Sequence, residues 1–226
     1  MIKSIQVLPN TFAEEILCEK SYQKFKRLNL LIGGNGVGKT TLIQAIANQK
    51  DVLMESNRDI RPYLYQNSRH NHRQLEANPF TDGHHFNRIA YQKMMAHEMS
   101  EGQSIIYSLL AFFNFLKEEA DAYPEATIVA LFDEVDSGLT PDHLNMVMHL
   151  WGELLKDHSN LQIIAACNQY HWVYCVKWAL NLQTGEWMNI NSYEEFCQLY
   201  FDQMTELGAL REHKFLKTSK YIPSKG

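Results

Sequence analysis

A glycine-rich segment at residues 33–41, Gly-Gly-Asn-Gly-Val-Gly-Lys-Thr-Thr, constrains the fold of this chain more than any other stretch. It fits the pattern G-x-x-x-x-G-K-[ST], in which glycines let backbone N–H groups turn inward around an anion. The apolar run at 28–32 predicts a buried strand before it, and residues 41–48 predict a helix after it. This order of strand, glycine loop and helix favours an α/β fold over a plain glycine-rich turn.

The side chains of this loop predict a nucleoside-triphosphate site. Lys39 can reach the β- and γ-phosphates, and the hydroxyl of Thr40 can ligate Mg²⁺. We expect the whole loop to line the phosphates, through Gly33, Asn35, Gly36, Val37, Gly38, Lys39, Thr40 and Thr41.

Composition excludes several other classes of protein. The 226 residues suit a single large domain, and a net charge of −5 gives no overall attraction to nucleic acid, although a local basic patch stays open. No apolar run is long enough to span a bilayer. The four cysteines lack C-x-x-C spacing and no secretory signal precedes them, so we expect reduced thiols and a cytoplasmic protein with no membrane partner.

An acidic pair supplies the second half of the predicted site. The apolar run at 126–132 predicts a strand buried on both faces, and it leads into Asp133 and Glu134. Asp133 would hold a Mg²⁺-bound water, and Glu134 would act as general base for the water that attacks the γ-phosphate. The alternative is an ordinary acidic turn at the end of a strand.

A third motif, Met-Ser-Glu-Gly-Gln-Ser at residues 99–104, precedes a predicted amphipathic helix at 102–119. A glycine loop, then L-S-x-G-Q, then a strand ending in Asp-Glu resembles the ABC-type ATPases. Met99 stands here for their Leu, and Glu101 for their usual Gly. The resemblance implies ATP as ligand and a head-to-tail dimer, in which Ser100, Gly102 and Gln103 face the ATP of the second copy.

The resemblance also suggests roles for single polar residues. Gln66 lies where the family has a glutamine that ligates Mg²⁺ or orients water, although a surface glutamine is the alternative. Asn168 lies near the position of the family's histidine, and His171 follows slightly later, so either could contact the γ-phosphate. Asp136 lies in a segment that resembles the family's D-loop, where Thr140 replaces a common Asp.

Within the family, the chain is most similar to the RecF and structural-maintenance-of-chromosomes branch. The run Leu-Asn-Leu-Leu-Ile-Gly-Gly-Asn-Gly at 28–36 and Asp-Glu-Val-Asp at 133–136 carry this similarity. It implies a single ATPase domain over 1–226: a P-loop core sheet with flanking helices, N-terminal antiparallel strands, a short helical lid at 67–98 and a basic tail at 214–226. Expected settings are DNA repair and phage defence, with a nuclease, a DNA-processing subunit or DNA as partner. The rival functions are a transporter energy subunit and an ATP sensor that hydrolyses little.

Periodicity predicts the remaining elements. We expect strands at 2–8, 12–18, 61–66 and 161–166, a polar loop at 51–60, helices at 86–97, 141–156 and 193–204, and a hairpin over 176–190. Phe12 or Tyr22 could stack on adenine or pack in the core. Arg58, Arg61, Arg69, Arg73 and Arg88 could form a basic face or an ordinary solvated surface.

Overall fold

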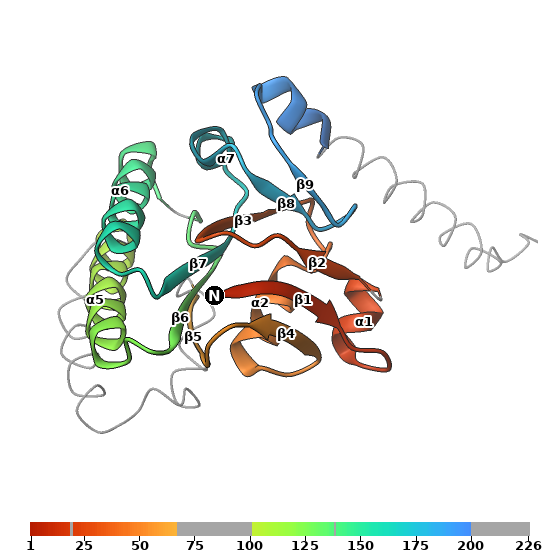
Figure 1. Cartoon of the computed structure of the whole chain (residues 1–226). Helices are drawn as coiled ribbons and strands as arrows, with labels where there is room; N and C mark the ends of the chain where they lie inside the picture. Colours follow the sequence, from red (N-terminus) through yellow and green to blue (C-terminus); the bar gives the residue numbers. More distant parts are fainter. Residues whose placement is uncertain (19, 67–100, 138, 200–226) are drawn as a thin grey trace, which may run out of the picture.

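The computed structural model describes residues 1–18, 20–66, 101–137 and 139–199. The expected lid, Ser100 and the basic tail lie outside these residues. The described part has an α/β fold with a mixed central sheet and flanking helices (Figure 1), which confirms the predicted fold class.

The central sheet has six strands in the order β5-β6-β7-β3-β8-β9. They are β5 (Ile60–Gln66), β6 (Thr127–Asp133), β7 (Leu161–Ala166), β3 (Leu28–Ile32), β8 (Ala179–Asn181) and β9 (Glu186–Met188). The first five run parallel, and β9 pairs antiparallel with β8 in the predicted hairpin. The four long apolar or aromatic runs were therefore correctly predicted as strands, and the structure places them in one parallel arrangement.

A second, antiparallel sheet has the order β2-β1-β4, from β2 (Ser21–Gln23), β1 (Ile2–Val7) and β4 (Val52–Ser56). The polar loop predicted at 51–60 is wrong, because 52–56 pairs with β1 from Val7↔Val52 to Ile2↔Ser56. Strand β4 is only partly buried and ends in two polar residues, so its sequence lacks the long apolar run that marks a fully buried strand. Pairing with β1, rather than local propensity, sets this strand.

The strand predicted at 12–18 is also wrong, since α1 (Phe12–Leu17) is a helix. Thr11 caps it, with its hydroxyl accepting a hydrogen bond from the Glu14 N–H at 3.3 Å. The Glu14 carboxylate accepts in return from the Asn10 N–H, next to the cap. The pattern T-x-x-E is a capping box, a helix start that the sequence does contain.

Helices cover both faces of the central sheet. Long helices α5 (Glu101–Ala122) and α6 (Pro141–Asp157) lie on one face, while α2 (Lys39–Asn48) and the small sheet lie on the other (Figure 1). Alternate residues of β6 therefore enter different cores: Phe132 packs with α5 and α6, and Leu131 packs with α2 and β1. The short helix α7 (Tyr170–Val176) was not predicted, and residues 193–199 begin the predicted last helix.

Tryptophans fill the α5–α6 core and pack at the hairpin. Trp151 and Trp172 are fully buried with ring centroids 4.8 Å apart, and Trp151 also contacts Phe132. Trp178 and Trp187 lie at the hairpin and are partly exposed. The core beneath β6 thus fixes the strand that ends in Asp133.

Candidate active site

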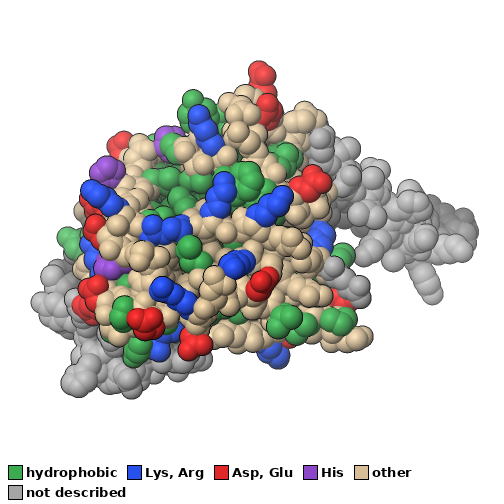
Figure 2. All heavy atoms as spheres, viewed as in Figure 1, with side chains coloured by type: hydrophobic (Ala, Val, Ile, Leu, Met, Phe, Trp, Pro, Cys, Tyr) green, Lys and Arg blue, Asp and Glu red, His purple; other side chains and the backbone are tan. Residues whose placement is uncertain are grey.

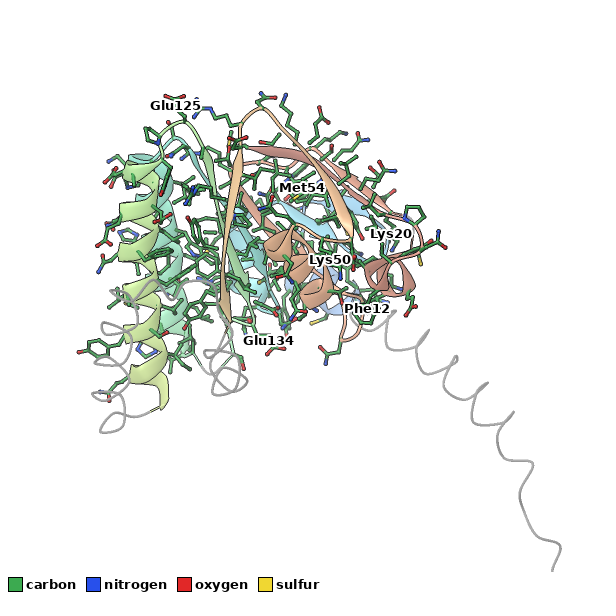
Figure 3. The ribbon with its side chains drawn as sticks, turned by 90° about the horizontal axis from the view of Figure 1, so that it is seen from below. Phe12, Lys20, Lys50, Met54, Glu125 and Glu134 are labelled. Carbon is green, nitrogen blue, oxygen red and sulfur yellow. The ribbon has the colours of Figure 1, made fainter. Side chains whose placement is uncertain are left out.

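The predicted site residues lie along one edge of the central sheet. Strands β3, β5, β6 and β7 are parallel, so their carboxyl ends meet there. Gly33 follows β3, Asp133 ends β6, and Gln66 ends β5 in register with Asp133. Figure 3 shows Glu134 at this edge and Glu125, which precedes β6, at the opposite edge. The fold therefore brings together segments that are a hundred residues apart in sequence.

The glycine loop joins β3 to α2 through backbone conformations that favour glycine. Gly33, Gly36 and Gly38 have φ angles of 140°, 86° and 98°. Gly38 is the left-handed N-cap of α2, so the free N–H groups of the first helical turn begin directly after the loop. A helix N-terminus of this kind stabilises an anion.

The first helix packs against this loop. A Cβ at Gly38 would lie 2.4 Å from Leu17 Cδ2 and 3.0 Å from Ile16 Cγ2, so α1 leaves no room for a side chain there. The loop is therefore shaped from outside by a helix that the strand prediction for 12–18 missed.

Lys39 is a buried ammonium at the centre of the loop. Its side chain is only 9% exposed, and Nζ donates to the carbonyls of Gly33 at 2.5 Å and Gly34 at 3.1 Å. Burial lowers the pKa of Lys39, and the carboxylates of Asp136 and Asp133 oppose that shift. A buried cation held among loop carbonyls fits a polyanionic ligand.

Thr40 and Asp133 bring two oxygen atoms together beside the loop, and these could hold a hard cation. The Thr40 hydroxyl donates to Asp133 Oδ1 at 3.1 Å, which joins the start of α2 to the end of β6. The described residues contain no cluster of three or more His, Cys, Asp or Glu that could hold a metal. A hydroxyl and one carboxylate still suit Mg²⁺, which usually takes its other ligands from phosphates and water.

Glu134 follows in a strained turn. Its φ of 53° is left-handed, which is uncommon for a residue with a side chain, and its carbonyl accepts from the Ser137 N–H at 3.0 Å. The side chain is exposed at the carboxyl edge (Figure 3). Such backbone strain occurs often at functional sites.

Strand β7 lies between β3 and β6, so its end meets both the loop and the acidic pair. Asn168, just beyond β7, donates its backbone N–H to Asp136 Oδ2 at 2.8 Å. Asp136 is 4% exposed, and burial raises the pKa of its carboxyl. The sequence analysis placed Asp136 only in a segment that resembles the family's D-loop. Its position as the third carboxylate directly after a buried strand was a signal that it belongs to the site.

His171 faces elsewhere. It lies in the first turn of α7, and its Nε2 lies 2.5 Å from Asn145 Oδ1 on α6. Of the two residues considered for the γ-phosphate, Asn168 lies nearer in sequence to the end of β7, whereas His171 is already part of the following helix.

The described part of the signature-like segment, from residue 101, begins α5 and lies beside β5, away from the glycine loop. Gly102 and Gln103 are in the first turn of α5, and Tyr65 Oη donates to the Ile105 carbonyl at 3.4 Å, tying that turn to β5. Three strand spacings, roughly 14 Å, separate β5 from β3. The first turn of α5 therefore does not reach the loop of its own chain.

The structure distinguishes between adenine stacking and core packing for Tyr22. Tyr22 is 0% exposed in the core of the small sheet, so it cannot stack on a ligand. Phe12 is 65% exposed on α1.

Two of the five arginines considered for a basic face lie in the described part of the chain. Arg58 donates to the Pro124 carbonyl at 3.1 Å, and Arg61 lies 3.5 Å from the centroid of the Tyr123 ring. Arg69, Arg73 and Arg88 lie outside the described residues.

Two solved structures with a similar fold come from ABC transporters. A metal-chelate-type ABC transporter in an inward-facing conformation matches with a TM-score of 0.53 and 19% identity, over 89% of this chain and 90% of that chain. A subunit of the CbiONQ transporter complex of Clostridium perfringens matches with a TM-score of 0.53 and 17% identity, over 94% and 100%. At these identities the likeness shows the fold alone.

The described residues contain no helix long and apolar enough to cross a bilayer. Comparison with curated proteins gave no match. The profile of the ATPase family associated with various cellular activities matches residues 29–175, which include the glycine loop, the acidic pair and Asn168. The chain therefore belongs to this ATPase family, the AAA family.

Proposed function

We propose that this chain binds ATP with Mg²⁺ and hydrolyses it at the carboxyl edge of the central sheet. The observation that carries the proposal is the hydrogen bond of 3.1 Å between Thr40 and Asp133, with buried Lys39 on one side and Glu134 on the other. This combination supports an anion site, a Mg²⁺ site and a base close together.

Each residue has a distinct role in this proposal. The loop amides and Lys39 hold the phosphates, while Thr40 and Asp133 hold Mg²⁺, with Gln66 as a further oxygen ligand. Mg²⁺, when bound, would supply positive charge across the β- and γ-phosphates. Glu134 accepts a proton from the attacking water, and Asn168 contacts the γ-phosphate as a neutral polar group. Catalysis then comes mainly from positioning and charge stabilisation.

A second copy of the chain would complete the site. The gap of roughly 14 Å between β5 and β3 supports a head-to-tail dimer, in which Ser100, Gly102 and Gln103 come from the other subunit. ATP would then hold two subunits together, and hydrolysis would release them.

Closure and release of this dimer would drive a conformational change in a partner. We propose that the partner is a nuclease, a DNA-processing subunit or DNA, in repair or phage defence. The motif similarity to the RecF and structural-maintenance-of-chromosomes branch supports this setting. The rival is a transporter energy subunit. The CbiONQ subunit is matched over 100% of its length, so chain size does not separate the two.

Phosphate release from ATP tests the proposed activity. We expect turnover with Mg-ATP and none when EDTA removes the metal. ATP binding without turnover in Mg²⁺ would indicate instead a sensor, a role that Asn168 in place of the family's histidine would suit.

Replacing Asp136 with Asn should raise the stability of the nucleotide-free protein at neutral pH. Burial raises the pKa of this carboxyl, so its contribution to stability is present below the unfolded pKa and is lost as pH rises through the folded pKa. Asn keeps an acceptor for the Asn168 N–H without the charge. We expect a gain on the order of 1 kcal/mol at pH 8 and a smaller one at pH 5.

Thermal unfolding at the two pH values checks this expectation. Asp142→Asn, an exposed carboxylate in the first turn of α6, is the control and should change stability little. An Asp136→Asn protein less stable than the wild type at pH 8 would show that the carboxylate is needed as counter-charge for Lys39.

A further inference from the structure

Exposed lysines gather at the amino-terminal edge of the central sheet, opposite the glycine loop. Lys26 precedes β3, Lys177 precedes β8, and Lys3 and Lys24 lie beside them; we call these four residues the lysine face. Figure 2 shows Lys and Arg side chains over the middle of this side of the molecule, with most carboxylates toward its margins. In a chain of net charge −5, this is a local reversal of sign.

The lysine face is continuous although its residues are distant in sequence. The Phe25 N–H donates to the Lys3 carbonyl at 3.3 Å, which joins β1 to the segment 24–26. Lys26 Nζ lies 3.7 Å from the centroid of a Trp178 ring, and Lys177 is the residue directly before Trp178.

Buried polar side chains hold the centre of this face in place. Asn29 Oδ1 accepts from the Lys26 N–H at 2.7 Å, and Gln162 Nε2 donates to the Lys26 carbonyl at 2.7 Å. Asn29 and Gln162 are both 0% exposed. Because the backbone is fixed before any ligand arrives, binding costs less conformational entropy.

An aromatic hollow of about 420 Å³ adjoins the lysines. Trp178 and Trp187 line it as a parallel pair, with centroids 5.2 Å apart and planes 10° apart, and both are partly exposed. Trp187 Nε1 donates to the Gln23 carbonyl, which bridges the two sheets beneath the hollow. Lys24 lies on its wall, and Glu186 is the one acidic residue among those that line it.

We propose that the lysine face and this hollow bind single-stranded nucleic acid. Lysines neutralise phosphates with release of counterions, and the exposed parts of the two indoles provide surface for unstacked bases. An acidic protein segment would satisfy the lysines but need not carry an aromatic ring beside each charge, whereas every nucleotide has a base next to its phosphate. The surface lies on the opposite edge from the proposed ATP site, so it is a separate binding function.

Binding of a dye-labelled oligothymidylate, followed by fluorescence anisotropy over a series of salt concentrations, tests the proposal. Lys24→Glu/Lys26→Glu should weaken binding at least about tenfold and reduce the slope of log K against log salt by about two. Lys50→Glu/Lys117→Glu makes the same change of net charge away from the face, after α2 (Figure 3) and on α5, and should have a much smaller effect.

Tryptophan fluorescence gives a second readout. Trp151 and Trp172 are fully buried, so quenching by the oligothymidylate would report on Trp178 and Trp187. We expect quenching in the wild type and in Glu134→Gln. The Lys24→Glu/Lys26→Glu protein should lose the quenching but keep the ATP hydrolysis of the wild type. Failure of the ATPase proposal would leave this binding intact.

Three results would overturn the assignment. They are no binding by the wild type at low salt, an equal loss in both lysine pairs, and competition by polyglutamate as strong as that by unlabelled oligothymidylate. The last would identify an acidic protein as the ligand.

Discussion

Glu134→Gln is expected to reduce ATP turnover by about 100- to 10,000-fold while ATP affinity stays near the wild-type value. Gln keeps the size of the side chain and its left-handed backbone, with φ of 53°, but it cannot accept the proton of the attacking water. The phosphate contacts of Lys39 and Thr40 are untouched, so binding should persist. Phosphate release and equilibrium binding of ATP, measured on one preparation, separate the two effects.

The same variant tests the dimer. If hydrolysis releases the subunits, Glu134→Gln should be dimeric by light scattering with Mg-ATP and monomeric without it. Glu125→Gln makes the same chemical change at the opposite edge of the sheet (Figure 3) and should match the wild type. Unchanged turnover in Glu134→Gln would exclude Glu134 as the base, and a monomer under both conditions would exclude the nucleotide-linked dimer.

Local signals were sufficient to predict the centre of this fold. The runs at 28–32, 126–132 and 161–166 are largely apolar because their strands are buried on both faces, and that pattern is visible in the sequence alone. The glycine loop can also be predicted from local sequence, because glycine adopts the positive φ angles of the loop without steric cost. The parallel order then places Asp133 near the loop.

Features that depend on contacts between distant segments could not be predicted in the same way. The partly buried strand β4 forms by pairing with β1, and the sequence of 52–56 alone does not predict a strand. The contact of Asp136 with Asn168 depends on β7 lying between β3 and β6, which is a property of strand order. The helix α1 differs, since its capping box was present in the sequence and was overlooked.

The packing of α1 against the glycine loop gives the second large expected effect, because Leu17 and Ile16 leave no space for a side chain at Gly38. Gly38→Ala should destabilise the protein by about 2–4 kcal/mol and weaken ATP binding. About 1–2 kcal/mol comes from the positive φ of 98°, and the rest from displacing Leu17, whose Cδ2 would lie 2.4 Å from the new Cβ. Urea denaturation measures the first effect, and ATP titration the second.

Gly36→Ala is the matched control for the backbone term. Its φ of 86° is also positive, but no atom lies within 4 Å of the added Cβ, so only about 1–2 kcal/mol should be lost. The contact itself is measured by a double-mutant cycle of Gly38→Ala with Leu17→Ala, because removing Leu17 should make the glycine substitution less costly, with a coupling of about 0.5–3 kcal/mol. Equal losses at Gly36 and Gly38, with no coupling to Leu17, would mean that α1 does not constrain the loop. A coupling that appears in both stability and ATP affinity would instead make α1 part of the device that holds the phosphate-binding loop in shape.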